Sequence, residues 1–358
     1  MTESRFADAC ARVGPVDAAA ASAAREYHDS LTKPRGSLGA LEDIGIQLCA
    51  IAGDCPPPVP APATVGVFAA DHGVVVEGVT PWPQEVTAQM VANFCAGGAA
   101  INVLAAHAGA RVVIVDVGVA TAIPAAEGQV LRRVVRAGTR NLAVEAAMTV
   151  DEVTAALEVG VEVAALAVEE GAGLLVTGDM GIGNTTASAA LIAAFTGRGA
   201  AEVTGRGTGV DDAALARKTA VVQGALARVP TGTAPLVVLA ELGGLEIAAL
   251  CGFIVGAASA RVPVLIDGVI AAAAALAAAA FAPDVVGYLI AGHRSSEPGA
   301  TAALTFLGLA PVLDLGMRLG EGSGAVLAVP TVQAAAKILR EMATFDAAGV
   351  TDKDGAGH

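Results

Sequence analysis

Short and almost continuously apolar runs recur along the chain, separated by segments in which apolar residues follow helical spacing. Continuous apolar runs are typical of strands buried on both faces, because helices cover both sides of a parallel sheet. We therefore predict an α/β fold with three layers, in which right-handed crossovers link the strands of a parallel β-sheet flanked by helices. The predicted strands are residues 63–70, 111–117, 174–177, 235–239, 262–266, 285–291 and 311–315.

Helical patterns mark both ends of the chain. Residues 15–31 and 37–53 precede a proline-rich stretch at 55–60, which is typical of a stiff linker, and residues 331–344 form the last helical stretch. Because 358 residues are many for one core, we expect a large domain with a smaller one attached. The predicted domains are a small helical domain of residues 1–59 and 325–345, a large α/β catalytic domain of residues 60–324 and a disordered tail of residues 346–358.

Polar residues next to glycine follow the predicted strands. In open α/β sheets ligands bind beyond the carboxyl ends of the strands, so these residues predict one site assembled from several loops. The alternative is that the Asp and Gly residues only cap helices and form turns. That alternative explains poorly the segment 293–299, where many polar groups follow a buried strand. The residues in question are Asp71, His72, Asp116, Asp179, Glu241, Asp267, His293 and Glu321.

The segment 178–186, with the sequence Gly-Asp-Met-Gly-Ile-Gly-Asn-Thr-Thr, lies between an apolar run and an alanine-rich helical run. Glycines let the backbone come close to a ligand, and free N–H groups at a helix start attract anions. Asn184, Thr185 and Thr186 are residue types favoured at a helix N-cap. The segment lacks the lysine of a Walker A loop and does not match G-x-G-x-x-G. It therefore predicts either a phosphate cradle of another kind or a tight strand-to-helix turn.

Three further side chains have two interpretations each from spacing alone. Glu321 lies between Gly320 and Gly322; burial would raise its pKa and make it a base near neutral pH, whereas the alternative is an exposed loop glutamate. Lys218 follows a glycine-rich turn, and the spacing favours an ordinary solvated lysine over a ligand-binding one. The single tryptophan, Trp82, could stack on a flat aromatic ligand, although packing against the protein is the commoner use.

Composition narrows the class of function. The net charge is −14 with only 21 Lys and Arg residues and no basic stripe, which argues against a nucleic-acid partner. A phosphorylated substrate would then be held by local dipoles. The five cysteines form no C-x-x-C pair, and residues 1–13 have no apolar signal region, so we expect free thiols in a cytoplasmic protein.

Two further classes of site are not expected. The chain has five His and no H-x-x-x-H or C-x-x-C spacing, so we expect no metal site, and we interpret His72 and His293 as structural residues. The apolar segment 262–281 contains Asp267 and opens as a β-like run. It is interpreted as a buried strand followed by a buried helix, not as a membrane span.

Several motifs in one order give the chain a specific resemblance. It resembles the nicotinate-nucleotide–dimethylbenzimidazole phosphoribosyltransferases, over about residues 33–342. The family implies a three-layer α/β large domain, a small helical domain built from both termini, a homodimer and no cofactor. The matching segments are Lys33-Pro34-x-Gly36-Ser37-Leu38-Gly39, Asp71-His72-Gly73-Val74, Pro83-x-x-Val86-Thr87-x-Gln89-Met90, Gly97-Gly98-Ala99-Ala100-Ile101-Asn102, Gly181-Ile182-Gly183-Asn184-Thr185-Thr186, Gly207-Thr208-Gly209 and Leu319-Gly320-Glu321-Gly322-x-Gly324-Ala325.

The resemblance also implies a reaction and roles for individual residues. Phosphoribosyl would pass from nicotinate mononucleotide to dimethylbenzimidazole, giving α-ribazole phosphate and nicotinate for cobalamin. Glu321 matches the family's catalytic base. The residues implied to hold the mononucleotide are Gly181, Gly183, Asn184, Thr185, Lys218 and Ser295, and those implied to line the base pocket are Asp179, Trp82 and Gln89.

Two residues depart from the family pattern as we expect it. Asp179 stands where many relatives have glutamate, and Trp82 stands where a smaller aromatic residue is usual. Transfer to another benzimidazole, a purine or a phenolic acceptor is therefore an alternative. A non-catalytic nucleotide sensor and a hydrolase of nicotinate mononucleotide are further alternatives, since a fold by itself does not fix a function.

Overall fold

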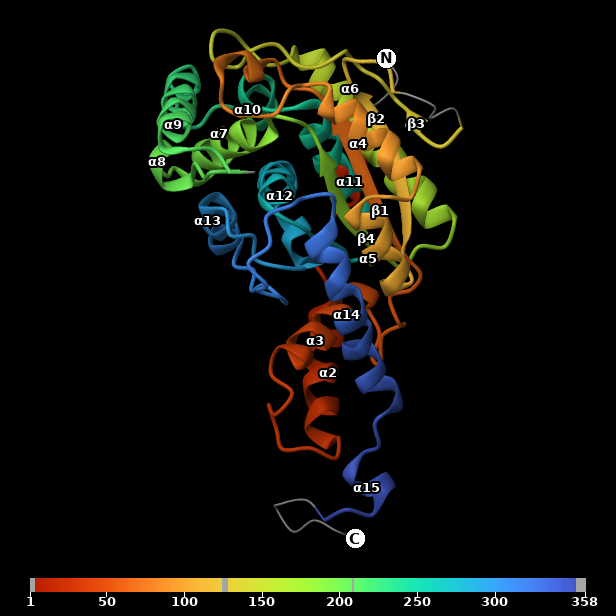
Figure 1. Cartoon of the computed structure of the whole chain (residues 1–358). Helices are drawn as coiled ribbons and strands as arrows, with labels where there is room; N and C mark the ends of the chain where they lie inside the picture. Colours follow the sequence, from red (N-terminus) through yellow and green to blue (C-terminus); the bar gives the residue numbers. More distant parts are fainter. Residues whose placement is uncertain (1–3, 124–127, 208, 352–358) are drawn as a thin grey trace.

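The computed structural model describes residues 4–123, 128–207 and 209–351 (Figure 1). A parallel sheet of six strands lies at the centre of the larger part, in the order β3-β2-β1-β4-β5-β6. This confirms the predicted α/β class. The strands are β1 (Ala63–Ala70), β2 (Arg111–Gly118), β3 (Leu131–Arg132), β4 (Leu174–Met180), β5 (Val264–Ile266) and β6 (Leu289–Ala291).

Both faces of the sheet are covered, so the larger part has the predicted three layers. Every residue of β1 is buried, and its side chains alternate between two apolar clusters. Phe68 and Ala70 join α6, α7, α11 and α12 on one face, and Val65 and Val67 join α4, α5 and α14 on the other. The helices so far named are α4 (Val86–Cys95), α5 (Ala100–Ala108), α6 (Val150–Glu169), α7 (Asn184–Thr196), α11 (Leu245–Ser259), α12 (Val269–Phe281) and α14 (Ser323–Glu341).

Helices α6 and α11 pack backbone to backbone against each other. A Cβ atom at Gly160 of α6 would lie 1.8 Å from the carbonyl oxygen of Ala249, and one at Gly252 of α11 would lie 1.9 Å from that of Leu157. Only glycine permits such an approach. The remaining elements are α1 (Arg5–Arg12), α2 (Ala18–Ser30), α3 (Ala40–Ala52), η1 (Gly73–Glu77), α8 (Ala200–Val203), α9 (Asp212–Leu226), α10 (Pro235–Leu242), η2 (Pro283–Tyr288), α13 (Pro298–Leu307) and α15 (Phe345–Ala348).

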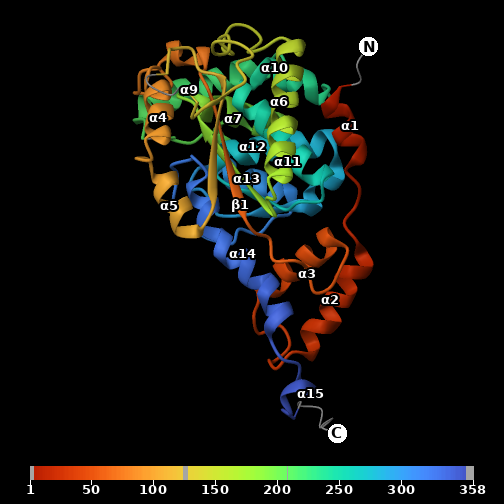
Figure 2. The same ribbon diagram turned by 90° about the vertical axis from the view of Figure 1, so that its right-hand side faces the viewer.

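The two ends of the chain meet below the sheet. Helices α2 and α3 pack together, and α14 runs from the sheet down along them (Figures 1 and 2). Helix α1 instead contacts α6 and α11, and its Phe6 packs edge-on against Phe281 at the end of α12, with ring centroids 5.0 Å apart. Helix α1 thus packs on the larger part, apart from α2 and α3. The domain boundaries stay a prediction.

Three predicted strands are wrong in whole or in part. Residues 235–239 lie in helix α10, which begins at Pro235, because proline at the first helical position has a suitable φ and needs no N–H partner. Residues 311–315 form no strand; Leu313 makes only an isolated bridge with His293. Of residues 285–291, only the last three are extended, and η2 occupies the rest. Strand β3 was not predicted, because its two residues carry no apolar run.

The C-terminal helices differ from the predictions, whereas the apolar segment 262–281 agrees with them. Helix α14 starts at Ser323, eight residues before the predicted stretch 331–344. The predicted stretch began directly after Pro330, but the structure places Pro330 inside the helix. Helix α15 occupies the start of the tail that we expected to be disordered, and residues 352–358 lie outside the described part. The strand-then-helix interpretation of 262–281 is confirmed by β5 and α12. The stretch Val86–Ala108 is long and apolar enough to span a membrane, but a turn at 96–99 divides it into α4 and α5.

Candidate functional site

The carboxyl ends of the central strands hold the residues that the sequence singled out. Asp179 lies at the end of β4, Asp267 follows β5, and His293 follows β6. One pocket at this edge is lined by the segment after β4, the segment after β6 and the turn before α14. Five of the predicted residues line it: Asp179, Gly181, Asn184, Thr185 and Ser295.

The predicted phosphate cradle is a strand-to-helix turn at the start of α7. Gly183 adopts φ 94° and stands at the N-cap of the helix, in the left-handed region that glycine enters at little cost. A Cβ atom at Gly181 would lie 2.5 Å from the carbonyl oxygen of Ala70, so this position is pressed against the end of β1. Gly181, Asn184 and Thr185 of this turn line the pocket, and the start of a helix is a place where proteins commonly bind anions.

A buried ion pair supports this turn from below. His72 Nε2 lies 2.6 Å from Glu246 Oε1, and both side chains are fully buried. Burial by itself would lower the pKa of His72, but the Glu246 carboxylate outweighs burial and raises it. A Cβ atom at Gly181 would lie 3.1 Å from Glu246 Oε1 and 3.4 Å from His72 Cδ2, so the pair packs directly under the turn. His72 is thus a hydrogen-bonded structural residue, as predicted.

Asp179 is a buried carboxyl group among other carboxylates. Its pKa is raised well above the ordinary value, first by burial and then by the negative charges of Asp267 and Glu246. Asn184 Nδ2 donates to Asp179 Oδ2 at 3.0 Å, and Asp179 Oδ1 has no partner within the described residues. The raised pKa favours the protonated form of Asp179, which can donate a hydrogen bond to a group in the pocket.

Lys218 is buried, which corrects our interpretation of it as a solvated lysine. Its Nζ donates to Thr185 Oγ1 at 2.8 Å and to the carbonyl oxygen of Gly205 at 3.1 Å. Burial lowers the pKa of Lys218 to about 8, and the nearby Glu297 carboxylate opposes that shift. Lys218 stands behind Thr185 and Gly207, both of which line the pocket.

Glu321 is also buried, which rules out the exposed loop glutamate. It is 5% exposed, and its Oε2 accepts a hydrogen bond of 3.1 Å from the N–H of Ile101 at the start of α5. Burial raises the pKa of Glu321, and the charge of Asp267 adds to this, whereas the Ile101 hydrogen bond opposes it. The residue before it, Gly320, lines the pocket. Glu321 is therefore a buried carboxyl group at the edge of the site, with a raised pKa that suits proton transfer.

Two residues implied for the base pocket do not reach it within this chain. Trp82 is 48% exposed, and neither it nor Gln89 is among the described residues that line the pocket. Gln89 lies on the exposed side of α4. Thr208, within one of the family-like motifs, lies outside the described residues.

Sequence reasoning missed Arg318 and Glu297. Among the described residues that line the pocket, Arg318 is the only Lys or Arg, and its Nη1 donates to the carbonyl oxygen of Gly207 at 2.7 Å. Glu297 Oε1 accepts from the N–H of Gly207 at 2.8 Å. The position of Arg318, directly before Leu319-Gly320-Glu321, was the available signal. Together these two side chains fix the backbone of Gly207 at the pocket wall.

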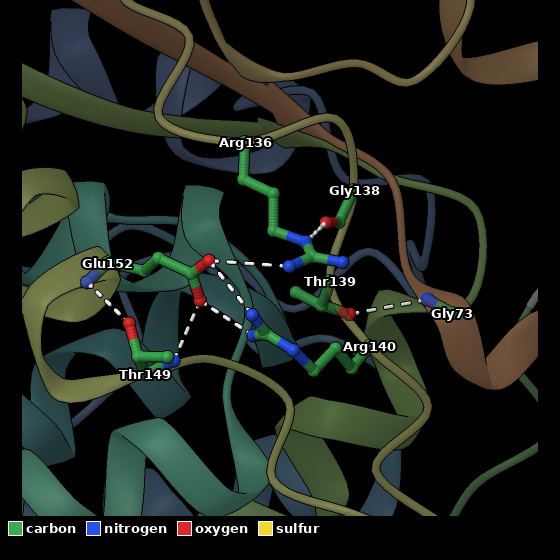
Figure 3. Close-up of polar contacts among 7 residues, drawn as sticks. All are labelled: Gly73, Arg136, Gly138, Thr139, Arg140, Thr149 and Glu152. Carbon is green, nitrogen blue, oxygen red and sulfur yellow. Dashed lines mark hydrogen bonds and ion pairs between the residues drawn. The ribbon is translucent and has the colours of Figure 1, made fainter.

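A polar cluster away from the pocket holds the segment after β1 in place (Figure 3). Glu152 accepts hydrogen bonds from Arg140 at 2.7 and 3.1 Å and from Arg136 at 3.3 Å. The Arg140 hydrogen bond is the main reason that the pKa of Glu152 falls to about 2. The same loop places Thr139 Oγ1 3.2 Å from the N–H of Gly73, which donates to it. This cluster is structural, because it anchors the loop that follows β3 to the residue next to His72.

Comparisons with known proteins agree with one another. A model of the phosphoribosyltransferase family matches residues 13–350. The chain is 57% identical to the nicotinate-nucleotide–dimethylbenzimidazole phosphoribosyltransferase of Salinispora tropica, over 96% of this chain and 98% of the relative. It is 54% identical to the protein of that name from Roseiflexus sp. (strain RS-1), over 98% and 99%. The crystal structure of the protein of that name from Thermus thermophilus is similar with a TM-score of 0.90 at 48% identity, over 94% and 99%.

Proposed function

Since the chain belongs to the phosphoribosyltransferase family, we propose that it transfers phosphoribosyl from nicotinate mononucleotide to dimethylbenzimidazole. The products are α-ribazole 5′-phosphate, which supplies the nucleotide loop of cobalamin, and nicotinate. The observation that carries this assignment is a buried carboxyl group, Glu321, next to Gly320, which lines the same pocket as the glycine-rich start of α7. Such a pair suits transfer of a phosphorylated sugar to a weakly acidic aromatic base.

The reaction needs a base and a phosphate-binding wall, but no general acid. Nicotinate in the mononucleotide is already a pyridinium cation, so no general acid is needed to expel it. Its departure leaves an oxocarbenium-like ribosyl centre, which the benzimidazole nitrogen attacks from the opposite face, turning the β configuration into α. Glu321 accepts the proton from the other ring nitrogen and stabilises the developing positive charge.

We assign the phosphate to the wall formed by the start of α7. Gly181, Gly183, Asn184 and Thr185 supply backbone and side-chain donors there, and Lys218 is bonded to Thr185. Arg318 and Ser295 add two more donors at the same pocket. The donors are local, as a chain with a net charge of −14 requires.

We assign the acceptor base to the part of the pocket beside Asp179. Asp179 lines the cavity, and its raised pKa favours the protonated form, which can donate a hydrogen bond to an acceptor nitrogen or hydroxyl. The roles of Trp82 and Gln89 stay predictions that rest on the family resemblance. So does the homodimer. The free cysteines fit a reducing compartment, so we also propose that the enzyme acts in the cytoplasm.

The assignment is tested with purified protein, nicotinate mononucleotide and dimethylbenzimidazole, measuring nicotinate and α-ribazole phosphate by chromatography. Both should appear. Glu321→Gln should lower the rate by about 10²- to 10⁴-fold, the usual contribution of a general base. Glu341→Gln, at an exposed position of α14, is the matched control and should keep the wild-type rate. Absence of both products at high enzyme concentration would refute the assignment, and a near wild-type rate in Glu321→Gln would remove that residue from its role.

A panel of acceptors separates the alternatives. Other benzimidazoles, purines and phenols replace dimethylbenzimidazole in the same assay, and one sample contains no acceptor. The enzyme assigned here needs an acceptor to release nicotinate. Equal release without an acceptor would mean that Glu321 activates water in a hydrolase, and binding without turnover for the whole panel would favour a nucleotide sensor.

A further inference from the structure

Asp267 binds the backbone of the turn that carries Glu321. It follows β5, is 2% exposed, and its side chain is fully buried. Its Oδ1 accepts hydrogen bonds from the N–H groups of Gly324 at 2.9 Å and Ala325 at 2.8 Å, and its Oδ2 accepts from Gly322 at 3.3 Å. One carboxylate thus meets three N–H groups directly after Glu321.

The turn needs such support. Gly320, Glu321 and Gly322 have φ values of 87°, 65° and 88°, so three successive residues are left-handed, and Glu321 is a residue that rarely adopts this conformation. The first N–H groups of a helix have no partner within the helix. Helix α14 has glycine at its N-cap and no capping side chain of its own, so Asp267 provides the cap from a neighbouring strand.

Asp267 itself is firmly placed. Its backbone N–H donates to Thr177 Oγ1 of β4 at 3.0 Å, and Thr177 Oγ1 donates to the carbonyl oxygen of Leu265 in β5 at 3.1 Å. His293, after β6, places Nε2 3.3 Å from Asp267 Oδ1. Through its backbone and its carboxylate, Asp267 therefore connects the ends of β4, β5 and β6 to the start of α14.

We propose that Asp267 is a positioning residue for the reaction, because it locks the turn of Glu321 and so fixes where that base meets the acceptor. The proposal rests on the proposed function in taking Glu321 as the base. Asp267 is distinct from a catalytic residue, since its oxygens are occupied by the N–H groups of the turn and by His293.

The charge of Asp267 should also affect how the rate depends on pH. It raises the pKa of Glu321, so removing it should lower that pKa. The groups that face this cluster from the packed elements are Asp179 from β4, His293 after β6, Glu246 from α11 and the N–H of Ile101 from α5. Because Glu321 works only when deprotonated, the rate falls as pH falls through its pKa. Loss of the Asp267 charge therefore shifts this acidic limb to lower pH.

The test compares Asp267→Asn with Ser323→Ala in steady-state assays across pH. Ser323 Oγ donates to the carbonyl oxygen of Gly320 at 2.7 Å, so its removal loosens the same turn without changing the charge. Both variants should lower kcat, Asp267→Asn by about 10²-fold, the effect of a misplaced catalytic group, while the KM for nicotinate mononucleotide changes little. Only Asp267→Asn should move the acidic limb. Asp284→Asn, at an exposed position, is the control.

Hydrogen exchange of the Gly322, Gly324 and Ala325 amides provides a readout independent of turnover, and it should speed up in Asp267→Asn. A wild-type enzyme without activity would refute the proposed function, whereas the exchange result would still decide whether Asp267 locks the turn. Wild-type kcat with an unmoved limb in Asp267→Asn, or unchanged exchange, would overturn the positioning role. If Asp267→Asn fails to fold, Ser323→Ala decides: lowered kcat supports the lock, and unchanged kcat refutes it.

Discussion

At the residue scale, the site contains two buried carboxyl groups, Asp179 and Glu321, whose surroundings differ. Asp179 is surrounded by Asp267, Glu246 and Glu321, and its pKa is raised well above the ordinary value, chiefly by burial. Burial raises the pKa of Glu321 too, but the N–H of Ile101 donates to its carboxylate and so opposes that shift. Neighbouring carboxyl groups with different surroundings commonly serve as donor and base in one site.

Asp179→Asn is expected to stabilise the protein at neutral and alkaline pH. A folded-state pKa above the unfolded one means that the stability contributed by Asp179 is present at low pH and is lost as pH rises through the folded value. Asparagine is uncharged at every pH and escapes this loss. Melting temperatures from pH 4 to pH 9 should show a gap between variant and wild type that widens with pH. A constant gap, as expected for Asp284→Asn, would contradict the pKa assigned to Asp179.

We predict that phosphate binding depends on pH near 8 through Lys218. Its pKa in the free protein is lowered to about 8 by burial, so the cation disappears as pH rises through that value. The KM for nicotinate mononucleotide should then increase above about pH 8. Lys218→Met should raise KM at pH 7 by about 10- to 100-fold, which corresponds to a charged hydrogen bond of about 1.5–3 kcal/mol, and should flatten the profile. Lys337→Met, at an exposed position of α14, is the control; an equal effect there would exclude a specific role for Lys218.

The sequence predicted the strand-to-helix turn before α7, whose conformation is decided by local chemistry. Gly181 and Asn184 are recognisable because a strand-to-helix turn needs those residue types. Lys218 was misinterpreted, since its burial depends on Thr185 and Gly205, which approach from other segments. Arg318 was missed for the same reason: its partner Gly207 lies in a distant loop.

At the scale of elements, the close packing of α6 against α11 should limit the stability of the protein. Gly160→Ala places a methyl group 1.8 Å from the carbonyl oxygen of Ala249, so the helices must separate. We expect the free energy of unfolding to fall by about 1–3 kcal/mol, the usual effect of overpacking. Urea denaturation measures this change.

Gly224→Ala, in α9, is the matched control. A Cβ atom there meets no other atom of the described residues within 4 Å, so the same substitution should raise the free energy of unfolding by about 0.5–1 kcal/mol, through helix propensity. Equal effects of the two substitutions would show that close contact between α6 and α11 does not limit stability.

The elements that sequence predicts well are those with enough length to show a pattern. Strands β1 and β2 lie in long apolar runs and were located within a residue. The run at 235–239 is equally apolar but helical, and periodicity cannot separate a fully buried helix from a buried strand. Its proline start was the deciding signal. The two-residue strand β3 exists only because β2 offers a free edge.

At the scale of the whole molecule, the site depends on strand order. Strands β4, β5 and β6 are neighbours in the sheet, and their carboxyl ends bring Asp179, Asp267 and His293 together although they are far apart in the sequence. Helix α14 starts at this edge and ends in the helical group formed with α2 and α3. The turn of Glu321 is thus connected to the small helical group by one continuous helix.

The central claim is tested most directly by the stoichiometry and anomeric configuration of the product. Purified enzyme, nicotinate mononucleotide and dimethylbenzimidazole are incubated with a chelator, and nicotinate and ribosyl product are followed by proton NMR. We predict one nicotinate released per ribosyl product, with that product in the α configuration and no nicotinate released when dimethylbenzimidazole is omitted. A β product, or nicotinate release that does not depend on the acceptor, would contradict the account.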